Sequence, residues 1–169
     1  EVQRELEETR DYWRNWVHRS TYKGRWREIV ERSAITLKLL TYESTGAMVA
    51  AVTTSIPEAL GENRNWDYRY CWLRDASLVL ESLKSVGHFR EARGFIGFLL
   101  NIFESKQSKI QILYRVDGST DLDEKTLPHL SGYRGATPVR IGNNACRTRQ
   151  NDIFGEVLNA IHLYYHHYE

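Results

Sequence analysis

Residues 88–104 constrain the fold most, because their apolar side chains recur at helical spacing on two sides of the segment. A helix that is apolar on two sides must be buried between neighbouring elements, because it cannot lie on a surface without exposing one stripe. The chain therefore has to fold around this segment. The first stripe consists of Phe89, Ala92, Ile96, Leu99 and Phe103, and the second of Phe95, Phe98 and Ile102.

Four further segments carry apolar residues at helical spacing, and together they predict a mainly α-helical chain. Residues 47–56 and 110–116 are typical of short extended segments. Residues 119–149 form a long polar connection, and a connection of this length is usually functional or disordered. The four segments are residues 5–20, 25–41, 75–86 and 152–168. In the last of them, Phe154, Val157, Leu158, Ile161, Tyr164, Tyr165 and Tyr168 are expected to face inward.

The composition excludes several classes of protein. With 169 residues, 41% of them hydrophobic, the chain can bury the core of one ordinary domain or of part of one. Its formal net charge of +1 gives no reason to expect a nucleic-acid or membrane partner, and no apolar run approaches the roughly 18 residues of a membrane span. Cys71 and Cys146 fit neither a disulfide framework nor a zinc site, so we expect two free thiols.

The chain begins with Glu1 rather than Met. We therefore expect its native N-terminus, with any signal peptide, to be absent or removed. The sequence leaves the localisation open.

The run WDYRYCWLRD, residues 66–75, carries the strongest chemical signal. Side chains of an extended segment alternate between two faces, so every second residue of the run is expected to share one face. Flat aromatic rings suit the apolar C–H faces of a sugar ring, and phenol hydroxyls add polar groups at the rim. Arg74 offers a planar fork of donors, and Asp75 can accept from two adjacent hydroxyls. The expected sugar-facing side comprises Trp66, Tyr68, Tyr70, Trp72 and Arg74.

The same residues also have a purely structural interpretation. An aromatic run with period two is often a strand packed in a core, Asp75 can cap the helix that starts beside it, and Arg74 can pair with a distant carboxylate. A carbohydrate-binding module without catalysis and a structural helical domain therefore remain alternatives to an enzyme.

Residues 65–77, NWDYRYCWLRDAS, resemble the first substrate-binding motif of glycoside hydrolase family 15. This family contains glucoamylases, glucodextranases and bacterial-type trehalases. Further segments resemble the family in the same order along the chain, and several matches in order are more specific than one. These segments are residues 111–118, 129–133, 138–143 and 152–158.

The resemblance implies the N-terminal part of an (α/α)6 barrel, which is built from helical hairpins. Residues 1–24 are then an entry or linker helix, and residues 25–169 the first helices of an incomplete catalytic barrel. The implied activity is inverting, exo-acting hydrolysis of an oligosaccharide or disaccharide with α-linked glucose. Neither a metal nor another cofactor takes part in that chemistry.

The resemblance also assigns roles to individual residues. Arg74 and Asp75 match the pair that holds the hydroxyls of the non-reducing-end sugar. The aromatics that wall this subsite match Trp72, Tyr70 and Tyr68.

The catalytic carboxylates are expected to lie outside the chain. Inverting hydrolysis needs a general acid and a general base, roughly 6.5–9.5 Å apart. In the family, both lie beyond the segment that resembles residues 152–168. Glu156 and Glu169 match neither position, so no catalytic residue is expected here.

Other groups of residues suggest ligands less well. His162 and His166 stand four residues apart but lack a third metal ligand, and the acidic residues of segment 121–124 do not follow the pattern of a calcium loop. Arg140, Arg147 and Arg149 form a basic cluster, but it lacks the interleaved aromatics of a nucleic-acid site. We therefore expect solvent-exposed histidines, no metal and a salt-bridged or solvated basic loop.

Overall fold

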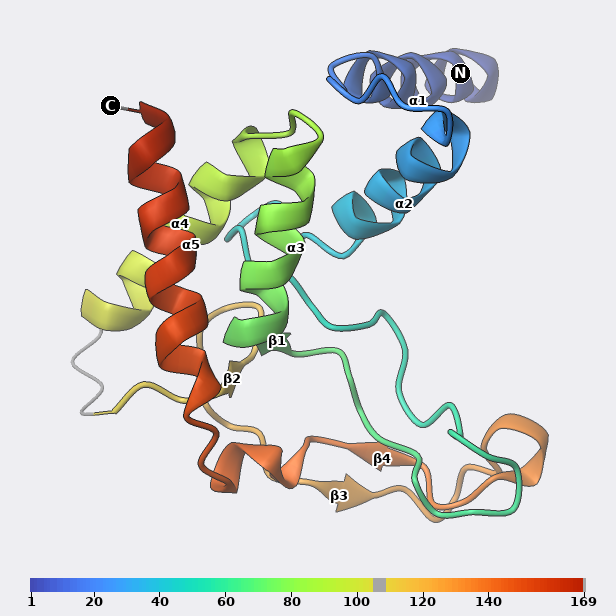
Figure 1. Ribbon diagram of the computed structural model, residues 1–169. Coiled ribbons are helices and arrows are strands. Elements are labelled where there is room, and N and C mark those ends of the chain that lie inside the picture. The colour runs from blue at the N-terminus through green and yellow to red at the C-terminus, as the bar shows by residue number, and fades with distance from the viewer. Residues whose placement is uncertain (105–108, 169) are drawn as a thin grey trace.

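The computed structural model describes residues 1–104 and 109–168, and these residues are mainly helical (Figure 1). Every helix expected from the sequence is present close to its expected bounds, so the mainly-α prediction is confirmed. The helices are α1 (Val2–Val17), α2 (Arg27–Leu39), α3 (Leu73–Ser85), α4 (Arg90–Glu104) and α5 (Asp152–Tyr168).

Two short antiparallel sheets connect segments far apart in the chain. The pairing of β1 (Cys71–Trp72) with β2 (Leu113–Tyr114) places Cys71 opposite Tyr114. The second sheet pairs β3 (Lys125–Thr126) with β4 (Arg140–Ile141). The long connection of residues 119–149 is thus ordered by a sheet and by two 3₁₀ turns, η1 (Tyr133–Gly135) and η2 (Asn144–Arg147).

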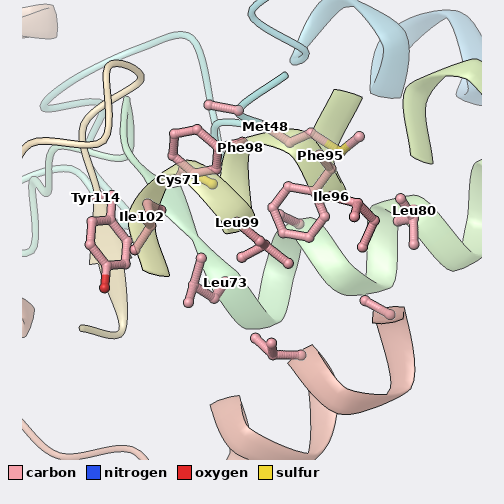
Figure 2. Close-up of a cluster of buried hydrophobic side chains, with 14 of the residues drawn as sticks. Met48, Cys71, Leu73, Leu80, Phe95, Ile96, Phe98, Leu99, Ile102 and Tyr114 are labelled. Atoms are coloured by element: carbon pink, nitrogen blue, oxygen red, sulfur yellow. The ribbon is translucent and has the colours of Figure 1, made fainter. Parts of the chain in front are cut away.

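The main core lies between α3, α4 and α5. Figure 2 shows Phe95 and Leu99 of α4 packed with Leu73 of α3, and all three side chains are at most 1% exposed. Members of both apolar stripes of α4 are buried, as its two-sided pattern predicts, but Phe103 of the first stripe is 39% exposed and Phe89 precedes the helix. Gly46 lies against α4 with φ of +83°, and a Cβ there would stand 2.1 Å from the carbonyl oxygen of Gly94. Any side chain at position 46 would therefore force this segment away from α4.

The helices α3 and α5 run side by side in the same direction, and both start at the end where the strands and long loops gather (Figure 1). Residues at the start of these helices therefore lie near one another.

Helix α1 is attached to the core through Trp16. Its indole ring stacks on His88 with ring centroids 3.7 Å apart, and its Nε1 donates to the Glu91 carboxylate at 2.9 Å. The same carboxylate pairs with Lys38 of α2 at 3.1 Å. A buried polar cluster thus joins α1, α2 and α4.

The inward face of α5 agrees only in part with the expected one, since Val157, Ile161 and Tyr164 pack on the main core as expected. Val157 and Ala160 are buried, whereas Phe154 is 48% and Leu158 67% exposed. The stripe that packs in the main core consists of residues 157, 160, 161 and 164, and Ile153 packs in a second cluster with Tyr70 and Trp72. Phe154 and Leu158 lie on the adjacent face. Tyr165 is also exposed, and the side chain of Tyr168 lies outside the described part. No helix within the described residues is both long and apolar enough to cross a membrane.

Candidate functional site

Three aromatic residues of the run 66–75 line one cavity. Trp66, Tyr68 and Trp72 form part of a hollow of about 390 Å³, and the rings of Tyr68 and Trp72 lie 6.0 Å apart. Polar and small residues from the long connection complete the lining. They are Glu124, Asn143, Asn144, Ala145 and Thr148.

The aromatic run is held in an extended form by residues 50–55. The amides of Ala50, Ala51 and Ser55 donate to the carbonyl oxygens of Tyr70, Tyr68 and Trp66, respectively, over distances of 2.9–3.0 Å. The extended form ends at Trp72, because α3 begins at Leu73. Alternation therefore agrees with the positions of Trp66, Tyr68 and Trp72, which share the cavity. It fails for Tyr70, which does not line the cavity, and it does not extend to Arg74.

Tyr70 lies behind the wall and is 6% exposed. Its hydroxyl donates to Asp67 Oδ2 at 3.1 Å and accepts from the amide of Gly142 at 2.9 Å. Burial and the negative charge of Asp67 raise the pKa of Tyr70, so the phenol stays protonated. The described structure thus places Tyr70 outside the residues that line the cavity.

Arg74 and Asp75 lie in the first turn of α3 and form an ion pair at 3.0 Å. Arg74 also donates to Asp152 at 3.0 Å and to Gln150 at 2.9 Å, so it ties the start of α3 to the start of α5. The N-cap residue of α3 is Trp72, so Asp75 does not occupy the capping position. The side chains of Arg74 and Asp75 are 34% and 39% exposed, which leaves both accessible to a ligand.

Asp75 lies near the aromatic wall. The pKa of Tyr68 is raised mainly by burial, with further contributions from the charges of Glu58 and Asp75. Arg74 and Asp75 are not among the residues that line the cavity, and they follow Trp72 of the aromatic wall by two and three positions in the chain. An aromatic surface beside paired donors and acceptors is suited to a neutral polyol.

The polar lining of the cavity was not predicted from the sequence. Glu124 pairs with Arg140 at 3.0 Å, and the guanidinium of Arg140 lies 4.6 Å from the centre of the Trp66 ring. The signals for these residues were the family resemblance of residues 138–143 and the amide and glycine residues at positions 142–144. Their convergence on Trp66 depends on the pairing of β3 with β4, which no local pattern specifies.

The remaining groups behave as structural or surface residues. Arg140 and Arg147 pair with carboxylates, which confirms a salt-bridged basic loop. The imidazole rings of His162 and His166 lie 5.8 Å apart, and no cluster of three metal-ligating side chains occurs in the described residues. Glu156 lies on α5 and does not line the cavity, and Glu169 lies outside the described residues. The thiols of both cysteines are free.

Comparisons with known proteins agree with the sequence resemblance. The chain is 49% identical to a trehalase of Thermoplasma acidophilum over 157 residues, which are 93% of this chain and 27% of that protein. It is 44% identical to a trehalase of Mycobacterium tuberculosis over 161 residues, or 93% of this chain and 24% of that protein. It is 40% identical to trehalase 1 of Sulfolobus acidocaldarius over 158 residues, again 93% of this chain and 27% of that protein.

The chain thus spans about a quarter of the length of the curated relatives that it matches. No solved structure matches it significantly. A family model described as "Glycosyl hydrolases family 15" matches residues 24–168, which include the aromatic run, the charged pair and all the lining residues of the cavity. The chain therefore belongs to family 15 of the glycosyl hydrolases.

Proposed function

We propose that this chain supplies the binding half of the non-reducing-end sugar subsite in an exo-acting, inverting α-glucoside hydrolase. The observation that carries the proposal is the cavity in which Trp66, Tyr68 and Trp72 face a polar lining. Because the relatives in the comparison are named trehalases, trehalose is the substrate that we propose first. Maltodextrin and dextran are the other α-linked glucosides to be compared with it.

In this proposal, each part of the site contacts a different part of the sugar. The rings of Tyr68 and Trp72 pack against the C–H face, and Arg74 and Asp75 hold adjacent hydroxyls. Tyr70, with its buried hydroxyl, supports the wall from behind. No metal or other cofactor is assigned a role.

The proposal places both catalytic carboxylates outside this chain. Among the described residues, Glu124 is the one carboxylate that lines the cavity, and it is already paired with Arg140. Asp75 is paired with Arg74 in the same way. Each carboxylate is therefore suited to accept hydrogen bonds from sugar hydroxyls. A general acid and a general base then come from elsewhere in the protein.

The proposed architecture is an (α/α)6 barrel of which residues 25–169 form the first helices, with residues 1–24 as the entry helix. The exposed Phe154 and Leu158 of α5 support this proposal, because a helix with apolar residues on a second face accommodates further packing.

The test is hydrolysis of trehalose by the full-length protein that carries this chain, followed by NMR of the released anomers. Trehalose joins two α-anomeric carbons, so inversion at one of them releases α- and β-glucose in equal amounts before mutarotation. A retaining enzyme would release only α-glucose, which would contradict the inverting mechanism. Binding of α-glucosides without hydrolysis would instead support a non-catalytic carbohydrate-binding module.

A further inference from the structure

Asp67 is a buried carboxylate at the centre of the candidate site, and the proposed chemistry does not use it. Its side chain is fully buried, although its two neighbours in sequence, Trp66 and Tyr68, line the cavity. A buried carboxylate is costly unless hydrogen bonds and an opposite charge compensate it. The partners that compensate Asp67 therefore indicate what it does.

The first set of partners holds the aromatic run itself. Arg69 donates to both carboxylate oxygens of Asp67, from Nε at 2.9 Å and from Nη2 at 2.8 Å. The backbone amide of Arg69 donates to the same carboxylate at 3.2 Å, and the Tyr70 hydroxyl at 3.1 Å. These bonds fix the backbone between Tyr68 and Tyr70, and thereby the direction in which the Tyr68 ring points.

The second set of partners belongs to the opposite side of the cavity. The amide of Gly142 donates to Asp67 Oδ2 at 3.2 Å, and Asn143 Nδ2 donates to the Asp67 carbonyl oxygen at 3.0 Å. Asn143 lines the cavity and also accepts from the amide of Ala145 at 2.9 Å. One residue thus holds both the aromatic wall and the polar lining.

Gly142 allows a third segment to join this arrangement. Its φ is +81°, and a Cβ there would stand 2.1 Å from the carbonyl oxygen of Asp123. The backbone next to Glu124 therefore passes directly against the segment that Asp67 holds. The spacing between Glu124 and the aromatic wall depends on this contact.

We infer that Asp67 is a positioning residue, which sets the distance between the aromatic wall and the Glu124–Asn143 side of the sugar subsite. Its carboxylate acts through Arg69, Tyr70 and Gly142, and it does not touch the substrate. The inference rests on the proposed function, because the subsite is the one proposed to bind the non-reducing-end glucose. A displacement of about 1 Å in such a site is enough to reduce catalysis by around 100-fold.

The experiment compares Asp67→Asn with the wild type in the full-length protein, using trehalose kinetics well below the melting temperature. The substitution replaces one acceptor oxygen with an amide donor that faces the donors of Arg69, Tyr70 and Gly142. We expect the KM for trehalose to rise by at least ~10-fold, with a smaller fall in kcat. Tyr70→Phe removes one link of the same network, and we expect a smaller rise in KM.

Asp117→Asn is the matched control, because the Asp117 carboxylate is exposed and accepts only from Ser119 in the described structure. We expect its kinetics to equal those of the wild type. If Asp67→Asn lowered only the melting temperature and left KM unchanged, Asp67 would be merely structural and the inference would be overturned. If that variant does not fold, an unchanged KM in Tyr70→Phe overturns the inference. A wild-type protein that hydrolyses no α-glucoside would overturn the proposed function, and this inference with it.

Discussion

At the scale of single residues, the charged pair in the first turn of α3 combines a structural and a proposed binding role. Arg74 contacts Asp75, Gln150 and Asp152, so part of its hydrogen-bonding capacity is used within the protein. The sequence left two interpretations of Arg74 open, a sugar-binding role and a structural ion pair, and one side chain can serve both. It pairs with a distant carboxylate and still presents an accessible guanidinium.

We predict that Arg74→Ala lowers kcat/KM for trehalose by roughly 100-fold or more, which corresponds to about 2.7 kcal/mol. The expected cause is loss of the donor fork that holds the sugar hydroxyls. Steady-state kinetics of the full-length protein measures the effect. Arg4→Ala is the control, because Arg4 pairs with Glu8 on the exposed surface of α1. Unchanged kinetics in Arg74→Ala would assign Arg74 a structural role alone.

A second prediction concerns His88, which is buried against the Trp16 ring. Burial lowers the pKa of His88 below its ordinary value of 6.5, and the charges of Arg19 and Lys38 act in the same direction, against that of Glu91. At pH values below 6.5, His88 is protonated to a greater extent in the unfolded chain than in the folded chain. We therefore expect the free energy of unfolding to fall as the pH drops through 6.5, by at most about 1.4 kcal/mol per pH unit.

Urea denaturation at about pH 7.5 and about pH 5.5 measures this effect. The lower pH is chosen above 4.5, the ordinary pKa of a glutamate such as Glu91. Glu91 contributes its own loss of stability only at lower pH, because its pKa is also lowered. His88→Gln is expected to show less pH dependence in this range than the wild type. His18→Gln alters an exposed histidine and should retain the dependence of the wild type. Equal slopes for His88→Gln and the wild type would contradict the assignment.

At the scale of elements, local patterns predict the helices well and their packing faces less well. The two stripes of α4 identify it as a central helix because burial on both sides leaves a strong periodic signal. In α5 the apolar residues cover more than one face, so the sequence could not reveal which face meets α3. Val157 is buried and Leu158 exposed, although both are aliphatic, because the position of α3 decides between them.

The central place of α4 leads to a stability prediction. Phe95 is fully buried in the main core, so Phe95→Ala is expected to cost about 3–5 kcal/mol of unfolding free energy. Leu100 lies on the same helix but is 49% exposed, and Leu100→Ala is expected to change stability by less than about 0.5 kcal/mol. Chemical denaturation of both variants tests the contrast. Similar losses in the two variants would show that the core is not centred on this face of α4.

At the scale of the whole molecule, the fold class and the aromatic part of the site follow from the sequence, and the polar part does not. The helices and the run 66–75 carry local signals. Glu124, Asn143 and Thr148 join the site only because the long connection returns to the aromatic run through β3 and β4. That return depends on buried contacts such as the bond from Gly142 to Asp67, which have no sequence signature.

The prediction at this scale concerns the 169 residues taken alone. We expect them to release no glucose from trehalose or maltose, because the proposed general acid and base lie outside them. A coupled glucose assay measures the activity, and circular dichroism verifies that the chain is helical. The full-length protein under the same conditions is the positive control. Turnover by the 169-residue chain would mean that an acid and a base are present within it.

The hydrogen bonds around Asp67 also have a consequence for the order of folding. The bonds to Gly142 and Asn143 join residues 75 and 76 positions apart in the chain, whereas each helix needs only contacts within a few positions. Closing a loop of this length has an entropic cost that only many simultaneous native contacts can offset. We therefore expect the cavity to appear last during refolding, after the helical signal has been recovered. Ligand binding then reports completed folding, and a sugar that fills the cavity stabilises the long connection more than the helices.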